Sequence, residues 1–333
     1  MLCVLRVARP RRFVPVVLLA LAVSACGGPD LGKQNFPRTT VTQTSAAAVP
    51  VDDPEVALDV QRTVDPCGLL RGDTVSGVGT PVEDSPYSSD LDSCSVEVTD
   101  AGGKQARLSL TMGDSIPLSI APEAGVVEGL PVVENDLDNP DTAENEGCVV
   151  SAVTHRTSSL GISVQVTYEG GDACGAGMTV IREVVARMHA GPPRLSRPAN
   201  SAVPLDPCAL ADDAVVAEVL GRGTEKGASG LHDCHWSGGN ADGYLRISET
   251  VEPSEGDNGT RVDLGGGVTG YQEKRTNAGN SCVIAWTHLK TGDGEGEIVK
   301  FTYDNFHDDA AGDDSCGKAR RIVGTILPKL PKS

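Results

Sequence analysis

The chain has 333 residues, of which 39% are hydrophobic and 3% aromatic, and its formal net charge is −18 at pH 7. This length is enough for two domains of ordinary size, whose cores must rest mainly on Val, Ile, Leu and Ala. The acidic balance, without a cluster of Lys and Arg beyond the N-terminal segment, argues against nucleic acid as a partner. Solubility alone explains such a surface.

The N-terminal segment, residues 1–25, predicts a bacterial lipoprotein signal peptide. Arginines precede an apolar run, Phe13 to Val23, which is shorter than the roughly 20 residues of a membrane-spanning helix. The junction from Val23 to Gly27 resembles the lipobox, in which a peptidase cuts before a cysteine that carries diacylglycerol. We therefore expect Cys26 to be the lipid-attachment residue, with the membrane as a partner through that lipid. An ordinary secretory signal cut after Ala25 is the alternative.

The segment that follows, residues 26–60, is polar and rich in small residues, threonine and proline. It has no apolar periodicity, so it predicts a disordered tether. A lipid on Cys26 would then hold the folded part clear of the outer face of the cytoplasmic membrane.

Cysteine spacing indicates an internal repeat beyond the tether. Asp65-Pro66-Cys67 and Asp206-Pro207-Cys208 each precede three further cysteines in the same order. Aspartate before proline is a helix-start signal, since the carboxylate can accept free N–H groups and proline suits the first helical position. We predict two copies of one domain, 61–190 and 205–331, joined by a Pro-rich linker, 191–204, that acts as an extended spacer.

Hydrophobic periodicity predicts the same order of elements in each copy. In the second, a helix from Asp206 to Leu220 should end at Gly221 or Gly223, and a last helix should begin near Cys316. The order helix, strands, helix predicts an α+β fold, in which an antiparallel sheet carries an N-terminal and a C-terminal helix on one face. The expected strands include 95–98, 107–110, 148–153 and 162–166 in the first copy and 244–248, 282–286 and 298–303 in the second.

An exported chain with even groups of cysteines is expected to form disulfides. Four cysteines allow three pairings per domain. We favour the pairing in which one member begins a helix and the other lies in a strand, because each bridge would then staple a helix to the sheet. The favoured pairs are Cys67 with Cys94, Cys148 with Cys174, Cys208 with Cys234, and Cys282 with Cys316.

The second copy resembles a known family. Asp206 to Leu210, Cys234-His235-Trp236, Cys282, Cys316 and Leu327-Pro328 are similar to the pattern of the actinobacterial lipoproteins grouped as the domain of unknown function 3558 family. The likeness covers 205–331 well and 61–190 more loosely, since Val96 stands where the pattern has tryptophan. The resemblance implies an exported, lipid-anchored, disulfide-bonded domain and brings no established activity.

The sequence carries no recognisable catalytic motif, so no catalytic residue, metal site or cofactor is predicted. His232-Asp233-Cys234-His235 has metal-ligand residue types, but Cys234 is expected to be oxidised and the two histidines to point to opposite faces of a strand. Gly265-Gly266-Gly267 is interpreted as a loop that needs a permissive backbone.

The chain repeats a domain with the same cysteines but does not repeat any catalytic residues. This pattern favours a binding function. Our hypothesis is a non-catalytic, sensor-like envelope lipoprotein that binds an unknown ligand or protein. One alternative is an extracytoplasmic hydrolase or metal-dependent enzyme that uses His232 or His235. Another is a structural spacer in the cell wall.

Overall fold

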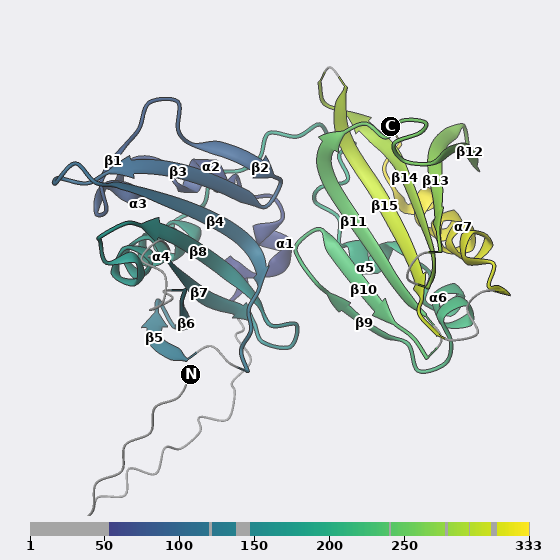
Figure 1. Cartoon of the computed structure of the whole chain (residues 1–333), viewed down its shortest axis with the longest axis horizontal. Helices are drawn as coiled ribbons and strands as arrows, with labels where there is room; N and C mark the ends of the chain where they lie inside the picture. Colours follow the sequence, from purple (N-terminus) through teal and green to yellow (C-terminus); the bar gives the residue numbers. More distant parts are fainter. Residues whose placement is uncertain are drawn as a thin grey trace, which may run out of the picture. The chain divides into compact units, whose positions relative to one another are not determined.

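The computed structural model of the chain describes residues 53–119, 122–137, 147–239, 241–276, 279–292, 294–307 and 312–332. Within the compact unit Val49–Ser333, the described residues form two antiparallel sheets with helices (Figure 1). The predicted α+β fold is therefore confirmed. Cys26 and the rest of 1–52 lie outside the described residues. None of the helices in the described ranges is long and apolar enough to cross a membrane.

The first sheet has the strand order β1-β3-β4-β8-β7-β6-β5, and β2 also pairs with β3. Helix α4 lies along one face of this sheet (Figure 1). The helical elements are η2 Pro54–Val56, α1 Leu58–Gln61, α2 Pro66–Leu69, α3 Asp73–Ser76 and α4 Ala173–His189. The strands are β1 Thr80–Pro81, β2 Tyr87–Asp90, β3 Ser93–Thr99, β4 Gln105–Ser115, β5 Glu123–Val127, β6 Leu130–Asp136, β7 Gly147–His155 and β8 Leu160–Tyr168.

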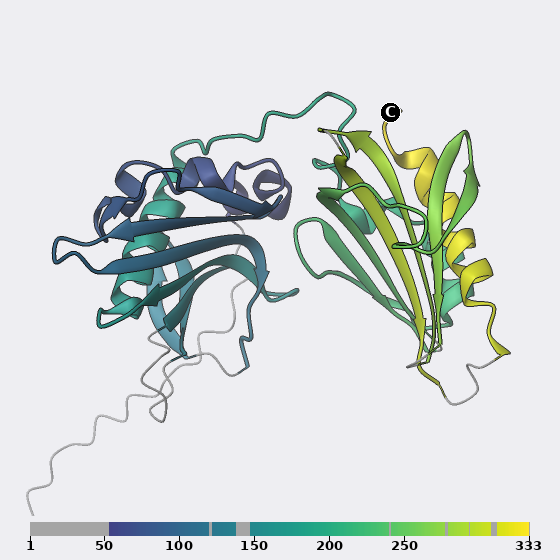
Figure 2. The same cartoon turned by 45° about the horizontal axis from the view of Figure 1, so that its top comes forward.

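The second sheet, read from β9, has the order β9-β10-β11-β15-β14-β13-β12, and helix α7 lies along one of its faces (Figure 2). The helical elements are α5 Pro207–Leu210, α6 Asp213–Leu220, α7 Ser315–Ile326 and η4 Leu327–Lys329. The strands are β9 Glu225–Ala228, β10 Asp233–Ser237, β11 Asp242–Val251, β12 Thr260–Gly265, β13 Val268–Arg275, β14 Asn280–Lys290 and β15 Glu295–Asn305.

The two sheets share one topology. From β3 to β5 and from β10 to β12, each element has its counterpart at the same place in the strand order. The pairing register agrees as well: Cys148 pairs with Val166, and Cys282 pairs with Tyr303. The repeat in cysteine order is therefore a repeat of the fold, and equivalent positions can be compared by counting from equivalent cysteines.

Four disulfides join helices to strands, and they link the cysteines that the spacing favours. They are Cys67–Cys94, Cys148–Cys174, Cys208–Cys234 and Cys282–Cys316. In each sheet one bridge holds the short N-terminal helix and the other holds the start of the long C-terminal helix. Both helices are thus positioned along the strands by covalent bonds.

The cores differ in composition. The first core is aliphatic, with Val, Leu and Ile from β3, β4, β7, β8 and α4. The second contains Trp236, Trp286, Phe301 and Tyr303, all at most 1% exposed. Few aromatic residues are available in the chain, and four of them are buried in the second domain.

The helix that the sequence predicts from Asp206 to Leu220 is wrong as a single element. Ala211 is extended, and the Asp212 side chain accepts hydrogen bonds from the N–H groups of Ala214 and Val215, so a new helix begins there. Aspartate in an extended conformation favours a helix start over a helix interior. The predicted stop at Gly221 is confirmed, since its φ of 107° suits glycine.

The predicted tether also ends earlier than expected. Residues 53–60 contain the 3-10 helix η2 and most of α1, and Val56 is fully buried in the first core. The apolar residues of this segment are too few for a periodic pattern, although Val56 supplies enough burial to hold it.

The linker is bonded along its length. Pro193 O accepts from Asp65 N, and Leu195 N donates to Thr63 O. Further on, the buried carboxylate of Glu297 accepts hydrogen bonds from Ser201 Oγ and Ala202 N at 2.6 and 2.8 Å. The linker contains turns at 199–200 and 203–204, and both of its ends are bonded to neighbouring elements.

Asp313 joins the end of β15 to the start of α7. Its carboxylate accepts from Tyr303 Oη at 2.6 Å and Asn305 Nδ2 at 2.9 Å, and lies 2.7 Å from Lys318 Nζ. Burial acts to raise the pKa of Asp313, but the hydrogen bonds from Asn305, Lys318 and Tyr303 outweigh it and hold this pKa below its ordinary value. Burial and the Asp313 hydrogen bond raise the pKa of Tyr303 to about 12.

Removing one bridge should destabilise the second domain. Replacing both Cys208 and Cys234 by alanine releases a loop of 26 residues. The chain-entropy model gives a loss of about 3 kcal/mol in the free energy of unfolding. Denaturant unfolding followed by tryptophan fluorescence measures this loss, because both tryptophans lie in that core. An unchanged midpoint would show that the bridge does not constrain the unfolded chain.

The Asp313→Asn variant should be less stable than the wild type by about 1 to 3 kcal/mol near pH 7, because Lys318 loses a charged partner and the hydrogen bonds weaken. A carboxylate whose pKa is lower in the folded chain than in the unfolded chain stabilises the fold at pH values above the unfolded pKa of about 4. This stabilisation is lost as the pH falls through the pKa of the folded state. Urea unfolding of both proteins at pH 7 and pH 3 should show the difference shrinking at pH 3. A difference independent of pH would contradict the ionic role.

Candidate functional site

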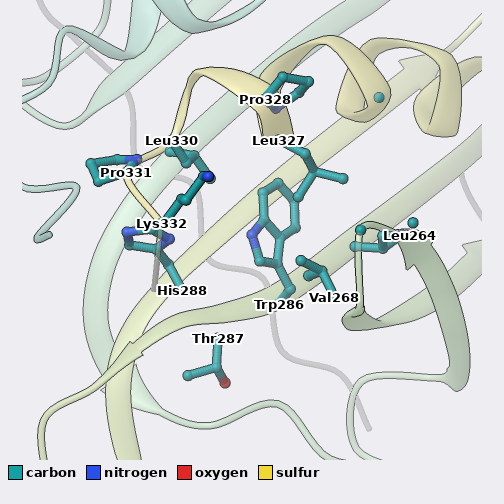
Figure 3. A pocket seen from close by; sticks show the side chains of 13 residues that line it. Leu264, Val268, Trp286, Thr287, His288, Leu327, Pro328, Leu330, Pro331 and Lys332 are labelled. Carbon is teal, nitrogen blue, oxygen red and sulfur yellow. The ribbon is translucent and has the colours of Figure 1, made fainter.

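A pocket of about 590 Å³ lies in the second domain where the end of α7 meets β14 and the β12–β13 hairpin. Figure 3 shows Leu327 and Val268 beside the ring of Trp286, with His288 near the C-terminal residues. The residues that line the pocket are Leu264, Gly265, Gly266, Val268, Trp286, Thr287, His288, Gly324, Leu327, Pro328, Leu330, Pro331 and Lys332.

Strand β14 supplies the floor of the pocket. Trp286 is 1% exposed and belongs to the core, so its indole is held by packing below the pocket. The register of β14 with β15 shifts between Thr287 and Leu289, which marks a bulge beside His288. His288 Nε2 lies 2.9 Å from Asn200 O, and this hydrogen bond fixes the ring against the linker.

The β12–β13 hairpin supplies one wall. Gly265, Gly266 and Gly267 have φ values of 89°, 63° and 84°, in the left-handed region that glycine adopts without strain. This tight turn brings Leu264 and Val268 close to the second core while leaving both partly exposed. The triple glycine therefore shapes the rim of the pocket.

The end of α7 supplies the opposite wall. Pro328 follows the helix, and the chain turns through η4, so Leu327 and Leu330 are only half-buried. Gly324 lies on the same wall, and a Cβ added there would meet no atom within 4 Å. The wall is therefore apolar and has free space at Gly324.

The chemistry of the lining suits an apolar ligand. Aliphatic side chains, glycines, prolines and one indole form most of its surface, and Lys332 carries the one full positive charge. No Asp or Glu is among the lining residues, although the chain as a whole is strongly acidic. A concave apolar surface with few polar groups is typical of ligand-binding pockets.

The sequence did not identify this pocket. The sequence predicts a loop at Gly265, Gly266 and Gly267, and a strand over 282–286 that ends at Trp286. Leu327 and Pro328 were noted as the end of the last helix. Three features of the sequence could have indicated the pocket: a triple glycine, a tryptophan in a strand, and a Leu-Pro pair at the end of a helix. They come from separate parts of the chain and lie close together only in the folded structure.

His232 and His235 are not brought together as a metal site. His232 is 1% exposed, with Nε2 3.0 Å from Val203 O and Nδ1 2.6 Å from Asp92 Oδ1. His235 stacks on Tyr244, with ring centroids 4.5 Å apart. Cys234, between them, is held in the bridge to Cys208. Each histidine thus has its own structural contacts.

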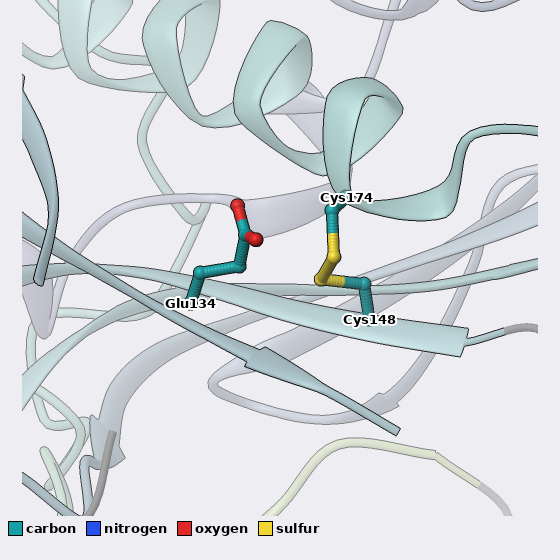
Figure 4. Close-up of side chains that lie close together, drawn as sticks. All are labelled: Glu134, Cys148 and Cys174. Atoms are coloured by element: carbon teal, nitrogen blue, oxygen red, sulfur yellow. A yellow bond between two sulfur atoms is a disulfide. The ribbon is translucent and has the colours of Figure 1, made fainter. Parts of the chain in front are cut away.

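Two groups of metal-ligand residue types occur within the described ranges. In the first, the carboxylate of Glu134 lies near the disulfide of Cys148 and Cys174 (Figure 4). A disulfide offers no thiolate, so this group lacks the ligands that its residue types suggest. In the second group, His189 Nε2 lies 2.8 Å from Asp53 Oδ2 and so joins α4 to η2.

No protein-family model matches the chain, and no curated protein matches it. Among solved structures, "Crystal structure of MucB in complex with MucA(peri)" aligns at 13% identity over 72% of this chain and 88% of that chain, with a TM-score of 0.16. The di-domain ARO/CYC StfQ from the steffimycin biosynthetic pathway aligns at 14% identity over 80% of this chain and 92% of that chain, with a TM-score of 0.11. Neither likeness carries an argument about fold or function.

Proposed function

We propose that the chain is an exported lipoprotein, anchored through Cys26 to the outer face of the cytoplasmic membrane, that binds an apolar ligand or an apolar segment of another protein. The binding is non-catalytic, and its site is the pocket over Trp286. The likeness to the domain of unknown function 3558 family, which rests on residues of the second copy, supports the export and the anchor.

The observation that carries the proposal is an apolar pocket in a domain whose helices are joined to the sheet by disulfides. The bridge Cys282–Cys316 holds α7 against β14, and the pocket lies where both elements end. A pocket held by a disulfide and a packed indole is preorganised, which lowers the entropy cost of binding. The four disulfides also favour an oxidising compartment, in agreement with export.

Filling the pocket should abolish binding. We expect the uncharged fluorophore N-phenyl-1-naphthylamine to bind the wild-type chain, and the Gly324→Phe variant to bind it at least ten-fold more weakly, because the added ring enters the free space at Gly324. Gly324→Ala is the matched control, since it adds one methyl group and should keep binding. Fluorescence titration measures all three proteins. Equal binding by Gly324→Phe would exclude this pocket as the site.

Lipid anchoring has a separate test. The Cys26→Ala variant lacks the sulfur that would carry the lipid, so we expect it to move from the membrane fraction to the soluble fraction. Fractionation followed by immunoblotting measures the distribution. Cys3→Ala is the matched control and should remain with the membranes. Membrane retention of the Cys26→Ala variant would contradict an anchor at this residue.

A further inference from the structure

The first domain shows what occupies the equivalent position. Counted from the strand cysteines, Thr154 on β7 corresponds to His288 on β14. Counted from the helix cysteines, His189 at the end of α4 corresponds to Pro331. Both second-domain residues line the pocket. Thr154 therefore marks the equivalent place on the first sheet, and His189 lies at the end of the equivalent helix.

That place is filled in the first domain by the segment Asp53–Val56. Val56 is fully buried in the first core, and η2 contacts α4. Gln61 Nε2 donates to Val56 O at 2.6 Å and to Thr154 Oγ1 at 3.0 Å. At the other end of the segment, Asp53 Oδ2 lies 2.8 Å from His189 Nε2. Asp53 thus meets His189 and Gln61 meets Thr154, while Val56, between them in the sequence, is buried in the core.

The surrounding walls close in the first domain and stay open in the second. Leu130 at the start of β6 is 1% exposed and Met188 near the end of α4 is also 1% exposed. Val268 corresponds to Leu130 by the register of the hairpin, and Leu330 corresponds to Met188 by the count from the helix cysteines. Both Val268 and Leu330 are half-buried and line the pocket. The apolar side chains at this end are thus buried in one copy and half-buried in the other.

In the second domain the residues at the places of Asp53 and Val56 make other contacts. Counted back from Asp206, the residue at the place of Val56 is Arg197, whose guanidinium makes two hydrogen bonds to Glu249 at 2.9 and 2.6 Å. The residue at the place of Asp53 is Arg194, which forms a β-bridge with Val64. Arg194 and Arg197 are thus held by other contacts, and the linker meets the pocket at Asn200, whose O lies 2.9 Å from His288 Nε2.

We infer that the pocket of the second domain takes a short segment of another polypeptide, with an aliphatic side chain seated as Val56 is seated in the first domain. This inference rests on the proposed binding function and names its ligand class. The segment in the first domain places a carboxylate, Asp53, at the end of the terminal helix, where it meets His189. In the second domain the cation beside that place is Lys332, so an acidic residue shortly before the aliphatic one fits best.

The probe for this inference is the chain's own segment as a free peptide. An acetylated and amidated peptide of residues 51–58 should bind the full-length Cys26→Ala chain, as measured by calorimetry and by Trp286 fluorescence. A Val56→Asp peptide should bind at least ten-fold more weakly, because a charge would enter the apolar pocket. The protein variant Gly324→Phe should lose binding by at least ten-fold, and Gly324→Ala should keep it.

An acyl-chain probe separates the inference from the proposed function. Laurate is titrated into the same proteins. If laurate binds with the same sensitivity to Gly324→Phe and the peptide does not bind, the pocket is a ligand site but the peptide inference is overturned. If neither the peptide, laurate nor the fluorophore binds, the proposed function itself fails. Peptide binding that survives Gly324→Phe would place the peptide elsewhere and also overturn the inference.

Discussion

The bridge between Cys282 and Cys316 sets the geometry on which the pocket depends. It fixes the start of α7 beside the start of β14. The lengths of the helix and the strand then determine which strand residues lie under the end of the helix. Leu327 lies about 16 Å along the helix from Cys316 at about 1.5 Å per residue. Trp286 and His288 lie about 13 to 20 Å along the strand from Cys282 at about 3.3 Å per residue. The helix therefore ends directly over the tryptophan and histidine, and the pocket forms where the helix no longer covers the strand.

The two domains show how one topology gives a closed end and an open end. Ala152 occupies in β7 the place that Trp286 occupies in β14. The first domain combines a small residue at this place with a buried valine from η2. The second combines an indole with a triple-glycine turn, and Val268 and Leu330 are half-buried there. Both domains bury the strand residue at this place, Ala152 or Trp286. In the second domain, Val268 and Leu330 beside it stay half-buried.

Much of the fold was predictable from local patterns. Cysteine order revealed the repeat, and the alternation of apolar residues located strands such as β11 and β15. The break at Asp212 was missed because the apolar stripe continues across it, while the aspartate cap competes successfully for a new helix start. The segment of Val56 was missed because one valine buried by tertiary packing has no periodic signal of its own.

The candidate site was less predictable, because its residues share no motif. Trp286, Leu264 and Leu327 lie in three elements, and each has an ordinary local explanation as a strand core residue, a hairpin residue or a helix end. His232 and His235 attracted a chemical interpretation by residue type, yet His232 is buried against Val203 and Asp92, and His235 stacks on Tyr244. The sequence already argues against a metal site at this pair, but it offers no comparable signal for the pocket over Trp286.

The open pocket follows from how a second copy must be connected. In the first copy the segment before Asp65 contacts α4 through η2. In the second, the equivalent residues must also carry the chain from the end of α4. Pro193 and Leu195 are hydrogen-bonded to Asp65 and Thr63, and Arg197 is paired with Glu249. Moving these residues toward the pocket would break those bonds, so the connection between the copies limits how far the linker extends over the pocket beyond Asn200.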